Sequence, residues 1–153
     1  MIYIPIFLLL MKHMVNYWIF VSVPFTDFNV GTIYKMLKKI EATKRWSIGR
    51  KTPNRGRLSE GDKTLFYQGG EDGGKVIASA ELASSLQQHE NADSFVKIKN
   101  FEVWKKPIDI RALTDKLSFI KNKRHWGVYL QGGIVKISEV DYNKIIRKSE
   151  KLE

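Results

Sequence analysis

Short blocks of apolar residues along the chain predict several strands with a few helices between them. The run NYWIFVSV (16–23) is rich in aromatic and β-branched residues, which predicts a buried strand. Between residues 29 and 42, apolar side chains recur at helical spacing with lysines opposite them, which predicts an amphipathic helix over a sheet. A closing helix is predicted over 138–150, where Ser138 is the N-cap and Asp141 completes a capping box three residues later.

The middle of the chain predicts paired strands. KTLFYQ (63–68) and KVIASAEL (75–82) flank the turn sequence GGEDGG, so together they predict a hairpin. SFVKIKNFEVW (94–104) alternates apolar and polar residues, and a slip in this alternation near Asn100 predicts a β-bulge. The segment GVYLQGGIVKI (127–137) is predicted to form two short strands around a Gly-Gly turn.

Together these elements predict an α+β fold, a small and mostly antiparallel barrel of short strands with two or three packed helices. The 153 residues suit one domain with a sizeable core, and we expect it over 14–153. Residues 1–13 form an apolar run that Pro5 interrupts, too short to span a bilayer and without the features of a signal peptide. We expect this run to be a flexible or non-native extension, with the native start at Met11 or Met14.

The composition adds an excess of positive charge. Lys and Arg number 26 against 16 Asp and Glu, which gives a formal charge of +10 and favours a polyanionic partner, nucleic acid before membrane. The absence of cysteine excludes disulfides and thiol catalysis and fits a cytoplasmic protein. The three histidines are far apart and lack metal-ligand spacing, so we expect no metal and no cofactor.

Two basic stretches each contain one tryptophan. TKRWSIGRK (43–51) opens a region, 43–61, that has no long apolar run and is predicted to be a functional loop. FIKNKRHWG (119–127) places Trp126 directly after a cationic run. Cations beside an aromatic ring suit a nucleic-acid site, because the charges bind phosphates and the ring stacks on a base. The alternative is that both tryptophans are core residues with solvated neighbours.

The sequence resembles the EVE domains, which belong to the PUA-like superfamily together with the YTH domains. The resemblance runs from Asn16 to the last helix. It rests on YWIF, on WSIGRKTPN before EGDKTLFYQ, and on LSFIKNKRHWG before SEVDY, of which the FIKNK motif is the most specific. The resemblance implies a pseudobarrel with a pocket for one nucleobase, as in EVE readers of modified cytosine in DNA and YTH readers of methylated adenine in RNA.

The resemblance also implies a set of binding residues. Trp46 and Ser47 stand where YTH domains have a cage tryptophan followed by serine, although lone EVE relatives have glycine after this tryptophan. A second ring is expected from Trp18 or Trp126, each of which is also a candidate for the core. The full expected base pocket is Trp18, Trp46, Ser47, Asn54, Tyr67, Asn122 and Trp126. The expected phosphate contacts are Arg50, Lys51, Arg55, Arg57, Lys121, Lys123 and Arg124.

We therefore expect a non-catalytic module, with a monomer favoured, that reads a modified base in DNA or RNA, and we expect the modification to be a methyl group. Two alternatives remain open: an RNA-binding adaptor of the PUA type, and a nuclease acting on RNA, like the related ASCH domains. In a nuclease, Tyr67, Lys121, Lys123 and His125 would supply acid–base chemistry. No paired carboxylates for a metal and no nucleophile–base motif accompany them in the sequence.

Overall fold

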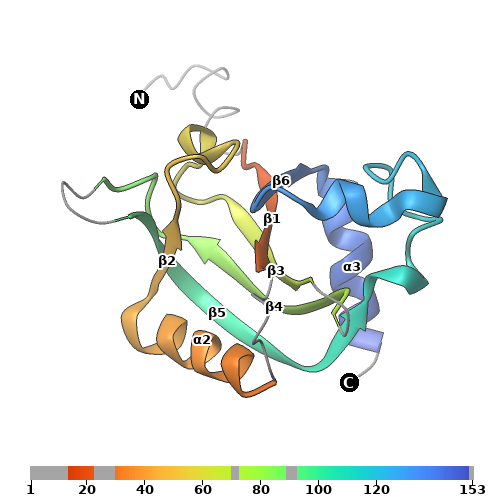
Figure 1. Cartoon of the computed structure of the whole chain (residues 1–153), viewed down its shortest axis with the longest axis horizontal. Coiled ribbons are helices and arrows are strands. Elements are labelled where there is room, and N and C mark those ends of the chain that lie inside the picture. Colours follow the sequence, from red (N-terminus) through yellow and green to blue (C-terminus); the bar gives the residue numbers. More distant parts are fainter. Residues whose placement is uncertain (1–13, 23–29, 70–72, 89–92, 152–153) are drawn as a thin grey trace, which may run out of the picture.

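The computed structural model describes residues 14–22, 30–69, 73–88 and 93–151. Six strands form one curled sheet in the order β2-β5-β4-β3-β1-β6 (Figure 1). The expected extension, residues 1–13, lies outside the described residues. In chain order the elements are β1 (Tyr17–Ser22), α2 (Val30–Thr43), β2 (Arg45–Ile48), β3 (Lys63–Gln68), β4 (Lys75–Leu82), β5 (Ser94–Asp109), β6 (Ile134–Ile137) and α3 (Glu139–Lys151), with 3₁₀ helices η1 (Arg55–Arg57), η2 (Ile110–Ala112) and η3 (Lys123–Leu130).

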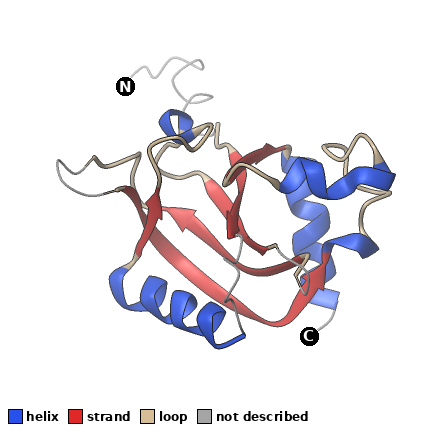
Figure 2. Ribbon diagram, viewed as in Figure 1, coloured by secondary structure: helices blue, strands red, loops and turns tan. Residues whose placement is uncertain are grey.

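The sheet is mostly antiparallel, and the expected α+β fold is confirmed. Four of its neighbouring strand pairs are antiparallel, and only β1 and β3 run parallel. Figure 2 shows the strands curling into a half-barrel, with α2 below β5 on one side and α3 with η2 and η3 on the other. The long strand β5 pairs with both β2 and β4, so it connects the two halves of the curl.

The two faces of the sheet are both buried, each in its own core. Successive side chains of a strand point to opposite faces. In β1, Trp18 and Phe20 therefore join the first core, whereas Ile19 and Val21 join the second. Helix α2 closes the first core through Leu37, and α3 closes the second. Further members of the first core are Ile40, Ile48, Phe66, Leu82 and Val96, and of the second Leu65, Tyr67, Leu117, Ile120, Leu130 and Ile145.

The predicted hairpin and bulge are confirmed. Strands β3 and β4 pair antiparallel from Lys63 opposite Glu81 onward. Between β4 and β5, Ser79 lies opposite Glu102 while Glu81 lies opposite Lys99, so β5 carries one extra residue there. Asn100 in this bulge has a φ of 52°, a conformation that asparagine tolerates better than most residues.

Two predictions of local structure were wrong. The region 43–61 is not one long loop, because it contains the edge strand β2 and the short helix η1. The segment 127–137 contains one strand, β6, since its first residues belong to η3. Gly132 and Gly133 both have φ near 90°, so this pair makes the turn from η3 into β6.

The predicted N-cap of the closing helix is present, but the capping box is not reciprocal. The Ser138 hydroxyl accepts a hydrogen bond from the Asp141 N–H at 3.1 Å. The Asp141 carboxylate instead reaches back to the segment before η3. It accepts from the N–H and hydroxyl of Ser118 and from the N–H of Phe119. A fully buried carboxylate therefore ties α3 to residues 118–119.

A second buried carboxylate sets where β1 and β3 begin. Asp62 is 1% exposed and precedes β3. It accepts hydrogen bonds from the N–H groups of Asn16 and Ser59 and from the indole N–H of Trp18, all at 2.9–3.0 Å. The Gly-Asp pair of the sequence is thus a structural element, because one side chain joins the start of β1 to the loop before β3.

We predict that Asp62→Asn lowers the free energy of unfolding by about 1–3 kcal/mol, measured by urea titration. Asparagine has one acceptor oxygen, so its amide group must face at least one of the three buried N–H donors. Glu60→Gln is the matched control, since Glu60 is exposed and two residues away. Equal stability of the two variants would contradict this role of Asp62.

Candidate nucleic-acid interface

Trp46 is positioned by a tight turn from α2 into the edge strand β2. Lys44 adopts a left-handed conformation, with φ of 57°, and its N–H donates to the Ile40 carbonyl to end the helix. Its own carbonyl accepts from the N–H of Ile98, which brings the chain onto β5. Trp46 then pairs with Val96 in the antiparallel ladder. The ring is therefore carried by a strand, not by the loop that the sequence predicted.

The Trp46 ring is half-buried at the border of the first core. It lies nearly parallel to the ring of Phe20, with centroids 5.9 Å apart, and meets Phe66 edge-on at 5.1 Å. Both phenylalanines are buried. Such aromatic packing fixes the plane of the indole while part of the ring stays open to solvent. A fixed and partly open ring is the kind of surface on which a base stacks.

Ser47 does not share the face of Trp46. Neighbouring residues of a strand point in opposite directions, and Ser47 is exposed while Trp46 and Ile48 turn toward the first core. The expectation that Ser47 and Trp46 contact the same base did not take this alternation into account. In this geometry Ser47 lies on the outer side of β2, opposite Phe95.

The basic segment after β2 packs on the turn before β6. Asn54 has a left-handed backbone, and its amide donates to the Ile134 carbonyl at 3.0 Å. The neighbouring Thr52 and Pro53 lie against Gly132 and Gly133, where an added Cβ would come within 3.3 Å of them. The amide of Asn54 thus anchors the segment to β6, a structural task that is separate from the expected contact with a base.

The basic residues of this segment differ in whether their side chains form hydrogen bonds within the protein. Arg55 donates to the Gly49 carbonyl at 3.3 Å, and Arg57 donates to the side chain of Asn54 at 3.2 Å. Within the part of the chain that the structure describes, Arg50 and Lys51 are exposed and make no side-chain hydrogen bond or ion pair. These two side chains can take phosphate oxygens without first breaking a contact.

The second basic stretch is held by its own contacts. The Lys123 ammonium donates to the carbonyls of Leu117 and Ile120 at 3.0 and 2.7 Å. The Asn122 side chain accepts from the N–H of Arg124 and caps η3, while the Asn122 N–H donates to the hydroxyl of Tyr129. Lys123 and Asn122 therefore stabilise η3. Of the expected phosphate contacts here, Lys121 and Arg124 are exposed.

Trp46 and Trp126 lie on opposite sides of the sheet. Trp46 borders the first core beside Phe66, whereas Trp126 borders the second core, to which Tyr67 belongs. Phe66 and Tyr67 are neighbours in β3 and point to opposite faces. The two tryptophans therefore do not sandwich one base in this structure.

The remaining candidate ring, Trp18, is fully buried in the first core. Its indole N–H donates to Asp62 at 2.9 Å, so neither its faces nor its donor is open to a ligand. Trp18 is a core residue, one of the two roles that the sequence left open.

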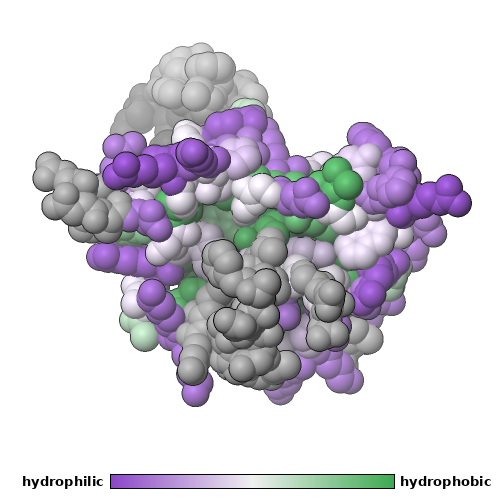
Figure 3. All heavy atoms as spheres, viewed as in Figure 1, coloured by the Kyte–Doolittle hydropathy of each residue, from purple (hydrophilic) through white to green (hydrophobic). Residues whose placement is uncertain are grey.

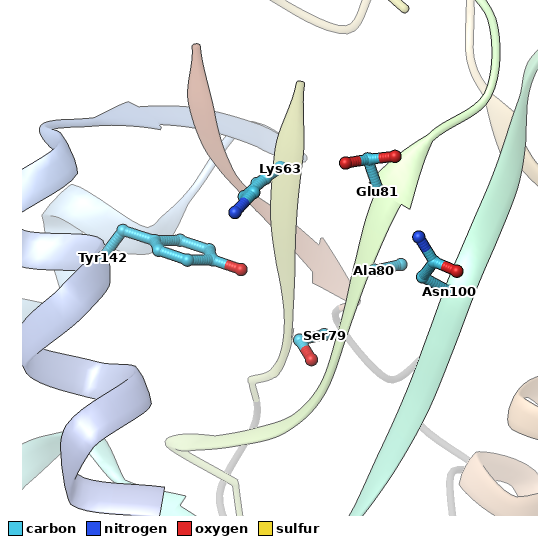
Figure 4. Close-up of a pocket in the computed structure, with 6 residues that line it drawn as sticks. All are labelled: Lys63, Ser79, Ala80, Glu81, Asn100 and Tyr142. Atoms are coloured by element: carbon cyan, nitrogen blue, oxygen red, sulfur yellow. The ribbon is translucent and has the colours of Figure 1, made fainter. Parts of the chain in front are cut away.

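The surface around these residues is polar at its edges. Figure 3 shows hydrophobic residues in the centre of one face, with hydrophilic residues above them and at both sides. A separate groove of about 190 Å³ lies on the face of the second core, and Figure 4 shows Tyr142 reaching into it from α3 toward Lys63. Sequence reasoning did not find this groove. Its lining is Lys63, Ser79, Ala80, Glu81, Asn100 and Tyr142.

The fold agrees with a comparison to protein families. A model of the EVE domain matches residues 16–148. The chain belongs to the EVE domain family. A curated relative, the "UPF0310 protein in gntR 5′ region" of Bacillus licheniformis, is 44% identical over 43 residues. This match covers 28% of the present chain and 29% of that relative.

Solved structures share the fold of this EVE domain at low identity. A hypothetical protein from Leishmania major superposes with a TM-score of 0.64 at 17% identity, over 91% of this chain and 97% of that one. Human THYN1, solved with DNA containing 5-methylcytosine, superposes with a TM-score of 0.59 at 10% identity, over 88% of this chain and 98% of that one. The YTH domain of Zygosaccharomyces rouxii MRB1, solved with N6-methyladenosine RNA, superposes with a TM-score of 0.59 at 15% identity, over 97% of this chain and 91% of that one.

Two further features bear on what this EVE domain contains. Among the described residues, no three His, Cys, Asp or Glu side chains come together as metal ligands would. No helix in the described ranges has the length and apolar character needed to cross a bilayer.

Burial raises the pKa of three tyrosines, Tyr17, Tyr67 and Tyr142, and the shift is large for the last two. It raises the pKa of Tyr67 to about 12, against a smaller lowering by Arg111 and a further rise from Asp109. It also raises the pKa of Tyr142 to about 12, with added contributions from Tyr17 and Glu81. Both phenols therefore stay protonated at neutral pH and can donate hydrogen bonds.

We predict that the domain loses stability as the pH rises from 10 toward 12. The unfolded chain releases these two phenolic protons near pH 10 and the folded chain only near 12, so deprotonation favours unfolding in this window. Urea titrations at pH 9 and pH 11 measure the loss. It should be smaller in Tyr67→Phe and in Tyr142→Phe than in the wild type, and equal losses in all three proteins would contradict the assignment.

Proposed function

We propose that this EVE domain is a non-catalytic module that binds nucleic acid and reads one modified base, stacked on Trp46. The observation that carries the proposal is the ring of Trp46 itself. It is half-buried, fixed by Phe20 and Phe66, and placed at the edge of the sheet directly before Arg50 and Lys51. Ring and cations then act together, because the ring binds the base and the cations bind its strand.

The energies favour a base that leaves its duplex easily. Flipping a base costs a few kcal/mol, and stacking on an aromatic ring returns about 1–3 kcal/mol. A buried methyl group adds only about 0.8 kcal/mol, which is less than a tenfold preference. Stronger selection for a modified base requires shape or hydrogen bonds that fail with the wrong base.

The solved relatives support the same class of ligand. Human THYN1 was solved with DNA that contains 5-methylcytosine, and the Zygosaccharomyces YTH domain with N6-methyladenosine RNA. These ligands belong to those proteins. The polymer and the modification that this chain selects are questions for binding experiments.

The contacts of the residues named for a nuclease argue against that alternative. The Lys123 ammonium is engaged by two backbone carbonyls, so it is not free to exchange a proton with a substrate. Burial raises the pKa of Tyr67 to about 12, which makes its phenol a weak acid at neutral pH. Incubation with labelled RNA and DNA tests this part of the proposal, because a reader leaves both strands intact.

We predict that Trp46→Leu weakens binding to the preferred modified oligonucleotide about tenfold or more. Leucine keeps an apolar contact with Phe20 and Phe66 but removes the stacking surface. Fluorescence anisotropy would be measured with DNA and RNA oligonucleotides that each carry one modified or unmodified base.

Trp104→Leu is the matched control for this experiment. Trp104 is also half-buried, but it borders the second core and donates its indole N–H to Ser79. Urea titration of both variants would test whether each is folded. If Trp46→Leu binds every oligonucleotide as the wild type does, or if the wild type binds all of them equally, Trp46 does not read a base.

We further predict that Arg50→Gln and Lys51→Gln each weaken binding to all sequences alike. Each should lower the slope of log K against log salt by about 1, because one phosphate contact and its released counterion are lost. Lys105→Gln serves as the control, since Lys105 is equally exposed on β5. A sequence-dependent loss, or an unchanged slope, would show that these side chains do not bind phosphates.

A further inference from the structure

Tyr67 is a buried residue whose hydroxyl group has no hydrogen-bond partner among the described residues. The residue is 4% exposed, yet within the described part of the chain its hydroxyl makes no hydrogen bond. Every fully buried side-chain nitrogen or oxygen described in this structure does have a partner. The Tyr67 oxygen therefore still reaches solvent, through a narrow opening that is called the crevice below, and it presents a donor there.

Three side chains converge on this crevice around Gly74. A Cβ built on Gly74 would lie 3.5 Å from the Trp126 ring and 3.8 Å from both the Tyr67 hydroxyl and the Arg111 guanidinium. Gly74 has φ of 91°, so the chain has a residue without a side chain at the point where these groups meet. A Cβ at this position would therefore be in van der Waals contact with a phenol, a guanidinium and an indole, which shows how closely the three groups approach one another.

Arg111 is held in place at this crevice. Its Nε and Nη2 donate to the two carboxylate oxygens of Asp109, each at 2.9 Å, and Nη2 also lies 3.5 Å from the Gly73 carbonyl. The Nη1 group is left without a protein partner among the described residues. Lys75 is close enough to Asp109 to lower the pKa of its carboxyl, after the larger effect of Arg111, so the three charges together leave an excess of one positive charge.

We propose that the crevice between Tyr67, Gly74, Arg111 and Trp126 binds a phosphate group of a nucleotide, next to the ring of Trp126. The Tyr67 hydroxyl and Nη1 of Arg111 donate to its oxygens, and the indole contacts the adjoining sugar or base. A fixed guanidinium beside a neutral phenol suits an anion with several acceptor oxygens. A cationic ligand is disfavoured, because both free groups are donors.

This site goes beyond the proposed reading of a base by Trp46. Tyr67 and Trp126 belong to the second core, whereas Trp46 borders the first. Phosphate binding in the crevice can therefore succeed where base reading fails, and the reverse also holds. Arg111 carries most of the charge of the site, and sequence reasoning did not name it.

Titration with deoxycytidine 5′-monophosphate, followed by NMR of the indole N–H signals, tests the proposal. We expect the Trp126 signal to shift and the Trp18 signal to stay, since the Trp18 indole is buried on Asp62. Deoxycytidine without phosphate should bind about tenfold more weakly or worse, because the charge-assisted hydrogen bonds are lost. No shift at Trp126, or equal binding of the nucleoside, would overturn the site.

Tyr67→Phe and Arg111→Gln should each weaken the nucleotide about tenfold. Tyr67→Phe removes a hydroxyl that no described residue uses, so the fold is not at risk. Tyr142→Phe is the matched control, because Tyr142 is a similarly buried tyrosine on α3, and Arg147→Gln is the control for charge. Equal weakening in the controls would overturn the assignment to the crevice.

The source of the phosphate is decided with oligonucleotides that carry either a 5′-phosphate or a 5′-hydroxyl. A preference for the 5′-phosphate that Arg111→Gln abolishes assigns the crevice to a terminal phosphate or a free nucleotide. If the two oligonucleotides bind equally well and Arg111→Gln weakens the binding of each, the crevice is assigned to the phosphodiester backbone. If Arg111→Gln changes neither and Trp46→Leu weakens both, the crevice is not part of the interface, and base reading stands alone.

Discussion

Burial of β1 and β3 on both faces is the constraint on which the rest of the structure depends. Four consecutive residues of β1, from Trp18 to Val21, are buried, so this strand must have a core on each side. Helix α2 closes one core, and α3 with η2 and η3 closes the other. The same constraint separates the aromatic residues that are proposed to bind a ligand, because a side chain can border only the core on its own side of the sheet. Trp46 and Trp126 consequently lie on opposite sides of the sheet and do not form one cage.

Two buried carboxylates hold the segments that the sheet itself does not reach. Asp62 joins the start of β1 to the loop before β3, and Asp141 joins α3 to residues 118–119. Each accepts three hydrogen bonds and neither forms an ion pair with a described residue, so backbone N–H groups compensate for much of the cost of burying the charge. Two of the segments on which the family resemblance rests, EGDKTLFYQ and SEVDY, contain these aspartates. Asp62 and Asp141 thus specify the fold and not the ligand.

The sequence predicted the elements whose patterns are local and missed those that depend on distant partners. The periodicity of β1, β3, β4, α2 and α3 lies within each segment. Strand β2 exists because Trp46 pairs with Val96, which is 50 residues away in the sequence, and no pattern within residues 43–51 indicates this pairing. From the sequence alone, Lys123 is interpreted as a free cation. In the folded chain its ammonium group donates hydrogen bonds to the carbonyls of Leu117 and Ile120. No sequence pattern pointed to Arg111, because its proposed binding role depends on its position beside Gly74 in the folded chain.

A polar side chain that has a hydrogen-bond partner in the protein stabilises this domain, whereas one without such a partner remains available to a ligand. Trp18, Asn54, Asn122 and Lys123 were all reasonable binding residues by type, and each has a protein partner in the structure. Arg50, Lys51 and the Tyr67 hydroxyl have none among the described residues. The Tyr67 oxygen still reaches solvent, so in the free protein this donor is left to water. The ion pair with Asp109 holds the Arg111 guanidinium near it, so an acceptor that replaces this water around Gly74 is favoured when it carries a negative charge.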